Sequence, residues 1–125
     1  MISAETEKLL SNLENIETGL SRVYGHLSRK EHFSSPVKKF WTTLMEEELV
    51  HASVFRELLK KSREEASFQV EAKTDRTRLE AFVEKVNDLL KKVKKEDLSE
   101  SEAYTIGALI EAELDEAHFV GTMTV

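Results

Sequence analysis

Glu48 and His51 are the two residues whose types and spacing most clearly suggest chemistry. They lie within residues 40–59, FWTTLMEEELVHASVFRELL, where apolar residues recur at the spacing of one helix face. The residues that predict this face are Phe40, Leu44, Phe55 and Leu58. The same face carries Glu48 and His51, which point the same way because they are three positions apart. Burying both groups is costly unless something compensates them, and a metal ion is one such partner.

The helix that must position this pair is predicted to begin at Ser35-Pro36 and to continue to about residue 62. Serine is a favoured N-cap, and proline fits the first helical position because its missing N–H is not needed there. A preceding helix is expected to begin near Ser3, with Glu5 and Glu7 in its first turn. The connection between the two helices, residues 30–35, is so short that they must form an antiparallel hairpin.

Glu17 is a third candidate ligand, and it lies in the first of these helices. The apolar residues of that helix are Leu9, Leu10, Leu13, Ile16, Leu20, Val23 and Leu27. Glu17 falls within their face, and Tyr24 lies seven residues further on, almost directly two turns away. Two alternatives remain open for Glu17, because it either points into the core or bends from the edge of the face to solvent.

The second half of the chain predicts a connection and two more helices. Residues 63–74 have a weak helical pattern, and Phe68 and Val70 have the two-residue spacing of an extended segment. An extended connection of this length could cross the bundle and place the third helix parallel to the second, whereas a helical continuation is the alternative. The third helix, residues 77–95, has an uninterrupted apolar face and contributes no inward-pointing acid.

The fourth helix is expected to begin at the capping-box sequence Ser99-Glu-Ser-Glu102 and to bring further ligands. Its expected core positions are Ala103, Ile106, Gly107, Ile110, Leu114, Ala117 and Gly121. Glu111 and His118 lie near the centre of this face, seven residues apart. Asp115 stands three residues before His118, as Glu48 stands before His51, but nearer the flank.

The candidate ligands share a level in the predicted bundle. Glu17, Glu48 with His51, and Glu111 with His118 each lie near the middle of a helix, and antiparallel helices of similar length bring their midpoints together. Carboxylate and imidazole ligands suit iron, manganese or zinc, and several carboxylates favour a pair of ions. Bundle-core di-metal sites use one glutamate from each of two helices and Glu-x-x-His from each of the other two.

Composition predicts an all-α single domain over residues 1–125. The net charge of −6 argues against nucleic acid and against anionic membrane surfaces as partners. The absence of cysteine excludes thiolate metal ligands and disulfides, which suits a reducing compartment. The N-terminal sequence does not resemble a signal peptide, and no window has the ~20 apolar residues of a membrane span. We therefore expect a soluble, cytoplasmic helical protein.

Two stretches of the sequence resemble rubrerythrin-like proteins of the ferritin-like superfamily. The first is Glu17 and Tyr24 followed by FWTTLMEEELVHA, and the second is EAYTIGALIEAELDEAHF, so the resemblance covers residues 14–58 and 102–119. It implies a ferritin-like four-helix bundle with a long connection between the second and third helices. It also implies a di-iron centre bound by Glu17, Glu48 and His51, with Glu111 as the opposing carboxylate and Tyr24 as a redox-accessible neighbour. Ferroxidation, oxygen activation or peroxide reduction would be the corresponding activities.

The sequence also departs from that family. A second full Glu-x-x-His helix is missing, so Asp115 and His118 substitute for it, the chain is a shortened form, or a second subunit of a homodimer completes the site. The cysteine-rich rubredoxin module is missing too, and electrons for peroxide reduction would come from a separate donor protein. The alternatives are zinc or manganese in the same ligands, or a degenerate, metal-free bundle that serves as an interaction or scaffold module.

Overall fold

Four helices and a short two-stranded sheet make up the described part of the chain in this computed structural model, which covers residues 4–64, 69–72, 76–117 and 120–124. The helices are α1 (Ala4–Ser28), α2 (Ser35–Glu64), α3 (Arg76–Lys95) and α4 (Glu100–Ala117), and the strands are β1 (Gln69–Ala72) and β2 (Val120–Thr124). The predicted helical bundle is confirmed in this coarse form. Within the described residues, no helix combines the length and apolar character needed to cross a bilayer.

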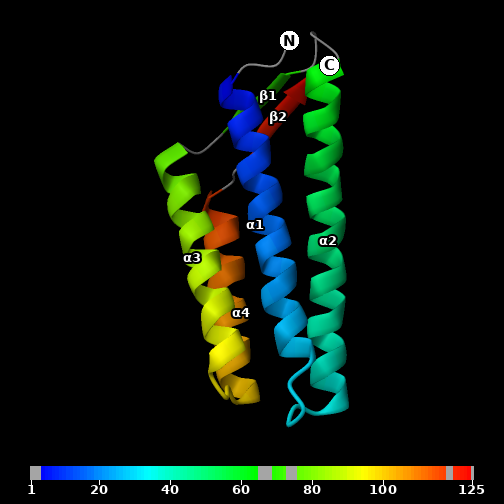
Figure 1. The fold of residues 1–125 in the computed structure, drawn as a ribbon, viewed down its shortest axis with the longest axis vertical. Coiled ribbons are helices and arrows are strands. Elements are labelled where there is room, and N and C mark those ends of the chain that lie inside the picture. Colours follow the sequence, from blue (N-terminus) through cyan, green and yellow to red (C-terminus); the bar gives the residue numbers. More distant parts are fainter. Residues whose placement is uncertain (1–3, 65–68, 73–75, 118–119, 125) are drawn as a thin grey trace.

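The helices alternate in direction (Figure 1). α1 and α2 form the expected antiparallel hairpin, and α3 begins at the end of the bundle where α2 ends, so α3 runs antiparallel to α2. The predicted connection is long, since residues 65–75 separate the two helices, but it does not cross the bundle. The alternative of a third helix parallel to the second is therefore wrong.

The extended segment expected near Val70 is confirmed over residues 69–72, where β1 forms. Its partner was not predicted, because the fourth helix was expected to continue to Gly121. Instead α4 ends at Ala117 and β2 pairs antiparallel with β1, with Val70 opposite Met123. A strand leaves backbone donors and acceptors unpaired until a second strand meets it, so a distant segment decided the conformation of residues 120–124.

The face of α2 that packs inward differs by one position from the predicted one. Phe40 is 43% exposed, whereas its neighbour Trp41 is fully buried. The buried positions of α2 are Trp41, Glu48, Ala52, Leu59 and Ser62. The indole ring lies against α4, where a Cβ at Gly107 would come within 2.9 Å of its Cη2 atom, so a glycine is needed there. Burial of this large ring rotates α2 so that Glu48 lies inside and His51 at the edge.

The other three helices bury the apolar residues that the sequence predicts. Glu111, which was expected near the centre of the buried face of α4, is exposed, and that expectation was wrong. α1 packs against both α2 and α3 and supplies the centre of the core (Figure 1). The buried apolar residues outside α2 include Leu13, Ile16, Leu20, Val23, Leu27, Leu79, Phe82, Val86, Val93, Ala103, Ile106 and Ile110. Apolar burial in this core is the main stabilising contribution.

The turns of the two helical hairpins are joined at one end of the bundle. The Lys30 ammonium group donates a hydrogen bond of 2.7 Å to the Val93 carbonyl oxygen, near the C-terminus of α3. The Ser34 backbone N–H donates to Glu100 Oε2 at 2.7 Å, at the first residue of α4. These contacts fix the start of α4 relative to the α1–α2 hairpin. They therefore also fix the height along the bundle at which the side chains of α4 meet α1 and α2.

Gly19 allows α1 and α3 to approach closely, and Gly19→Ala is expected to destabilise the protein. A Cβ at this position would lie 2.6 Å from Cγ1 of Val86, a stiff β-branched side chain. Overpacking of this kind costs about 1–3 kcal/mol, which outweighs the ~1 kcal/mol by which alanine favours a helix over glycine. Urea unfolding measures the change.

Val86→Ala provides the control for the Gly19 variant. It removes the methyl group that the new Cβ would meet, so it should cost less in the Gly19→Ala background than in the wild type. A Gly19→Ala protein as stable as the wild type would contradict the proposed clash.

Candidate metal centre

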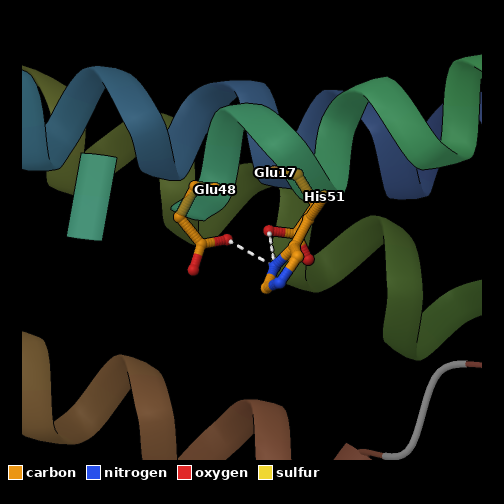
Figure 2. Close-up of side chains that lie close together, drawn as sticks. All are labelled: Glu17, Glu48 and His51. Carbon is orange, nitrogen blue, oxygen red and sulfur yellow. Dashed lines mark ion pairs between the residues drawn. The ribbon is translucent and has the colours of Figure 1, made fainter. Parts of the chain in front are cut away.

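Glu17, Glu48 and His51 converge between α1 and α2 (Figure 2). One ligand atom from each lies within 4.8 Å of the other two. Nδ1 of His51 is 3.6 Å from Oε2 of Glu17 and 3.6 Å from Oε2 of Glu48. The structure thus brings together the three residues singled out in the first two helices, and it answers the open question on Glu17, which points inward.

The two helices set the burial of this group. Glu48 and His51 lie one turn apart on α2, and Glu17 reaches them from the middle of the antiparallel α1. The Glu48 and Glu17 side chains are 6% and 13% exposed, whereas that of His51 is 55% exposed. His51 was expected on the buried face together with Glu48, and this was wrong, because the packing of Trp41 turns His51 to the rim. The group is closed on its carboxylate side and open at the imidazole.

Two carboxylate oxygens of the group have no hydrogen-bond partner among the residues that the structure describes. Within that part of the chain, Oε2 of Glu17 and Oε2 of Glu48 are both buried and accept no hydrogen bond, and the 3.6 Å separations from His51 are too long for one. Buried polar atoms almost always have a partner, so this pair requires an explanation. A divalent cation fits, because oxygen and imidazole nitrogen ligands together suit iron, manganese or zinc.

Glu111 of α4 lies near the group without joining its closest contacts. The Tyr24 hydroxyl donates a hydrogen bond of 3.1 Å to Oε1 of Glu111. Burial first, and then the charge of Glu111 and this hydrogen bond, raise the pKa of Tyr24 above its ordinary range, so the phenol stays protonated and acts as a donor. Glu111 is an exposed residue of α4 that accepts this hydrogen bond, and its negative charge acts on Glu48; its role as the opposing carboxylate stays a prediction.

The pKa of Glu48 is raised above its ordinary value. Burial is the largest cause, and the negative charge of Glu111 adds to it, whereas the neighbouring His51 acts in the opposite direction. In the metal-free protein the site therefore disfavours a negative charge on Glu48 in addition to the charge of the neighbouring carboxylates. A bound cation would reverse this preference and keep both carboxylates ionised.

This raised pKa predicts that Glu48 makes the metal-free protein less stable as the pH rises above 4.5, the ordinary value for the group. Above that pH the unfolded chain has lost the Glu48 proton while the folded chain still holds it, so the free energy of unfolding falls with pH. The contribution is fully present below 4.5 and is lost as the pH rises through the folded-state pKa. Glu48→Gln should remove this dependence in urea unfolding across the pH range.

Glu102 offers a control of opposite sign. The expected capping box forms, since the Ser99 N–H donates to Oε1 of Glu102 and the Glu102 N–H donates to the Ser99 hydroxyl, both at 3.1 Å. The backbone hydrogen bond from Ser99 is the main cause of the lowered pKa of Glu102. The contribution of Glu102 to the free energy of unfolding is present above pH 4.5 and is lost as the pH falls through the folded-state pKa of Glu102. If Glu48→Gln kept the wild-type pH profile, the burial argument for Glu48 would be wrong.

The remaining predicted ligands belong to the end of α4. The backbone of Asp115 lies in α4, but its side chain is outside the described part of the structure, and His118 lies outside the described residues altogether. Their predicted role as a second ligand pair remains a prediction.

An aromatic cluster that includes Tyr24, the hydrogen-bond donor to Glu111, was not predicted from the sequence. The Tyr24 and Trp41 rings stack with centroids 5.6 Å apart and planes inclined at 22°, and Trp41 lies 5.6 Å from Tyr104. Nε1 of Trp41 is buried and has no hydrogen-bond partner in the part of the chain that the structure describes. The sequence held one signal for this cluster, which is that Trp41, the single tryptophan of the chain, directly follows Phe40, the first residue of the predicted apolar face.

A comparison with protein-family models, curated proteins and solved structures finds no match for this chain. The likeness to rubrerythrin-like proteins therefore remains a resemblance of short motifs. Functional inference rests on the geometry of Glu17, Glu48 and His51.

Proposed function

We propose that this helical bundle binds iron at Glu17, Glu48 and His51, and that it acts as a di-iron carboxylate protein of the rubrerythrin-like kind. The observation that carries the proposal is the convergence of two buried carboxylate oxygens on one imidazole nitrogen, where neither oxygen accepts a hydrogen bond from a described residue. Bound iron would supply one-electron redox chemistry toward oxygen or peroxide. Ferrous iron, oxygen and peroxide are accordingly the proposed substrates.

The side chains have distinct roles in this proposal. Glu17 and Glu48 supply the negative charge that holds the cation, and the exposed side of His51 is where oxygen or peroxide enters. Glu111 is the proposed opposing carboxylate for a second ion, and the Tyr24 hydrogen bond orients it. Electrons for repeated turnover would come from a separate donor protein.

The ligands for the second ion have two proposed sources. Asp115 and His118 follow Glu111 in the chain, and the alternative is a second copy of the chain in a homodimer. Sedimentation with and without iron separates them, because iron-dependent dimers favour the shared site and an iron-bound monomer excludes it.

We propose the likeness to ferritin-like proteins for the metal ligands of the site and not for the connectivity of the helices. A Glu-x-x-His helix paired with a glutamate from a neighbouring helix supports it. The alternating helix directions differ from the single long crossover of ferritin-like folds. Glu17, Glu48 and His51 need only an antiparallel α1–α2 hairpin to meet, so the connectivity of the second hairpin does not affect their convergence.

Anaerobic loading with ferrous iron tests the proposal. The purified protein should retain iron after gel filtration, and addition of oxygen or peroxide should convert it to ferric iron, followed by absorbance. Parallel loading with manganese and zinc identifies the preferred ion, since nitrogen and oxygen ligands alone do not decide it. A protein that retains none of these ions would contradict metal binding at this site.

A metal-free interaction module is the second candidate, and the exposure of His51 favours it. A protonated imidazole 3.6 Å from both carboxylates would partly neutralise them without a metal. The α2 helix of this protein also exposes the apolar side chains of Leu49, Val50 and Val54, which suits contact with a partner protein. In this case no ion is retained, and replacing Glu48 with Leu and His51 with Met should stabilise the fold by about 1 kcal/mol or more.

A further inference from the structure

The single tryptophan and both tyrosines of the chain lie in one continuous series of ring contacts. Trp41 is in the middle, with the Tyr24 ring 5.6 Å away on one side and the Tyr104 ring 5.6 Å away on the other. The three residues come from α1, α2 and α4, so the tertiary fold and not local sequence brings them together.

The two ends of this series lie in different environments. Tyr24 is fully buried, and its hydroxyl donates to Oε1 of Glu111, the carboxylate whose negative charge acts on Glu48 of the candidate metal centre. Tyr104 is 42% exposed. The aromatic series therefore leads from the hydrogen-bond partner of Glu111 to the protein surface.

Trp41 has a feature that packing alone does not explain. Buried tryptophan N–H groups usually find an acceptor, but Nε1 of Trp41 has none among the described residues. An oxidised tryptophan normally loses its Nε1 proton and becomes a weaker oxidant. Without an acceptor this proton stays in place, so an electron vacancy on Trp41 remains strongly oxidising and passes on.

We propose that Tyr24, Trp41 and Tyr104 form a relay that carries single electrons between the metal centre and the surface. Tyrosine and tryptophan are readily oxidised by one electron, and electron tunnelling weakens steeply with distance, so two short steps are faster than one long step. The inference rests on the proposed function, because it gives the relay a redox-active metal at its inner end.

The electron and proton balance of the relay is as follows. An oxidant in the site takes one electron from Tyr24, and the phenolic proton passes to Glu111. Tyr24 recovers an electron from Trp41 and its proton from Glu111. Trp41 recovers an electron from Tyr104, which releases its phenolic proton to solvent. The separate donor protein, a one-electron redox protein, returns an electron to Tyr104, which takes a proton back from solvent. With hydrogen peroxide as oxidant, two passages and two solvent protons yield two waters.

The relay can be tested in the metal-free protein with a photo-oxidant at one surface position. The chain has no cysteine, so Ala108→Cys gives a single attachment point, exposed and one turn from Tyr104 on α4. A ruthenium polypyridyl label at this cysteine is flashed with an electron acceptor in solution, and tyrosyl radicals are detected by electron paramagnetic resonance. Adding Tyr104→Phe leaves Tyr24 as the sole tyrosine, so any tyrosyl radical must then be at Tyr24.

The expected result is a Tyr24 radical that depends on Trp41. Fluorinated tryptophan, which replaces only Trp41 and nearly preserves its size, should lower the yield about tenfold for each ~59 mV added to the potential of this residue. Phe40→Leu alters another ring beside Trp41 and Tyr104 and should leave the yield unchanged. The relay is contradicted if no Tyr24 radical forms, or if the yield of the Tyr24 radical does not change when Trp41 is fluorinated. Since no metal is present, either outcome is separate from a failure of iron binding.

Discussion

Replacing Glu48 with glutamine is expected to lower the affinity for ferrous iron by at least about a hundredfold. Residues that only orient metal ligands contribute about 10–100-fold, so removing the negative charge of a buried ligand should have at least the larger effect. Glu48 is the most buried of the three groups, and its Oε2 has no hydrogen-bond partner among the described residues. Anaerobic titration with ferrous iron, followed by calorimetry, measures the change.

Glu46→Gln is the matched control for the Glu48 variant. It removes the same charge two positions earlier on α2, from an exposed side chain, so the net charge and the helix are equally affected. Its affinity for iron should equal that of the wild type. Equal iron affinity in Glu48→Gln and the wild type would contradict the assigned site, even if the protein bound iron elsewhere.

Replacing Trp41 with alanine is expected to cost about 3–5 kcal/mol of stability, the usual loss for a buried aromatic residue. Trp41 is fully buried and contacts Tyr24 on α1 and Tyr104 on α4, so its removal leaves a cavity where three helices meet. Domains of this size are stabilised by only about 5–15 kcal/mol, and the loss is a large part of that total. Urea unfolding followed by circular dichroism measures it.

Phe40→Ala is the matched control for this effect. Phe40 is the adjacent aromatic residue of α2 and also contacts Tyr104, but it is 43% exposed. Its removal should cost clearly less, about 1 kcal/mol, because less apolar area returns to water. Equal losses in the two variants would show that Trp41 does not anchor α4 to the first hairpin.

Local sequence was sufficient for much of the bundle. The apolar spacing in α1, α3 and α4 predicts their buried faces, and Ser99 with Glu102 predicts the start of α4, because these signals depend only on helix geometry and on neighbours within one turn. Glu48 was found in the same way, since a lone acid on an apolar face is visible without a structure.

The orientation of α2 was not predictable at this level. Phe40 and Trp41 are adjacent and both apolar, so two helix faces were compatible with the pattern. The close approach of Trp41 to Gly107 chose between them, and this contact joins residues far apart in the chain. One consequence is that His51 lies at the open rim of the site.

For this protein, the sequence by itself determined which helices exist and that Glu17, Glu48 and His51 are candidate ligands. Only the tertiary structure decided that their atoms converge, that the Tyr24 hydroxyl donates to Glu111, and that residues 120–124 form a strand with β1. The physical reason is the range of the interactions. Helix periodicity and capping act within a few residues, whereas convergence, ring stacking and strand pairing depend on segments that meet only when the chain folds.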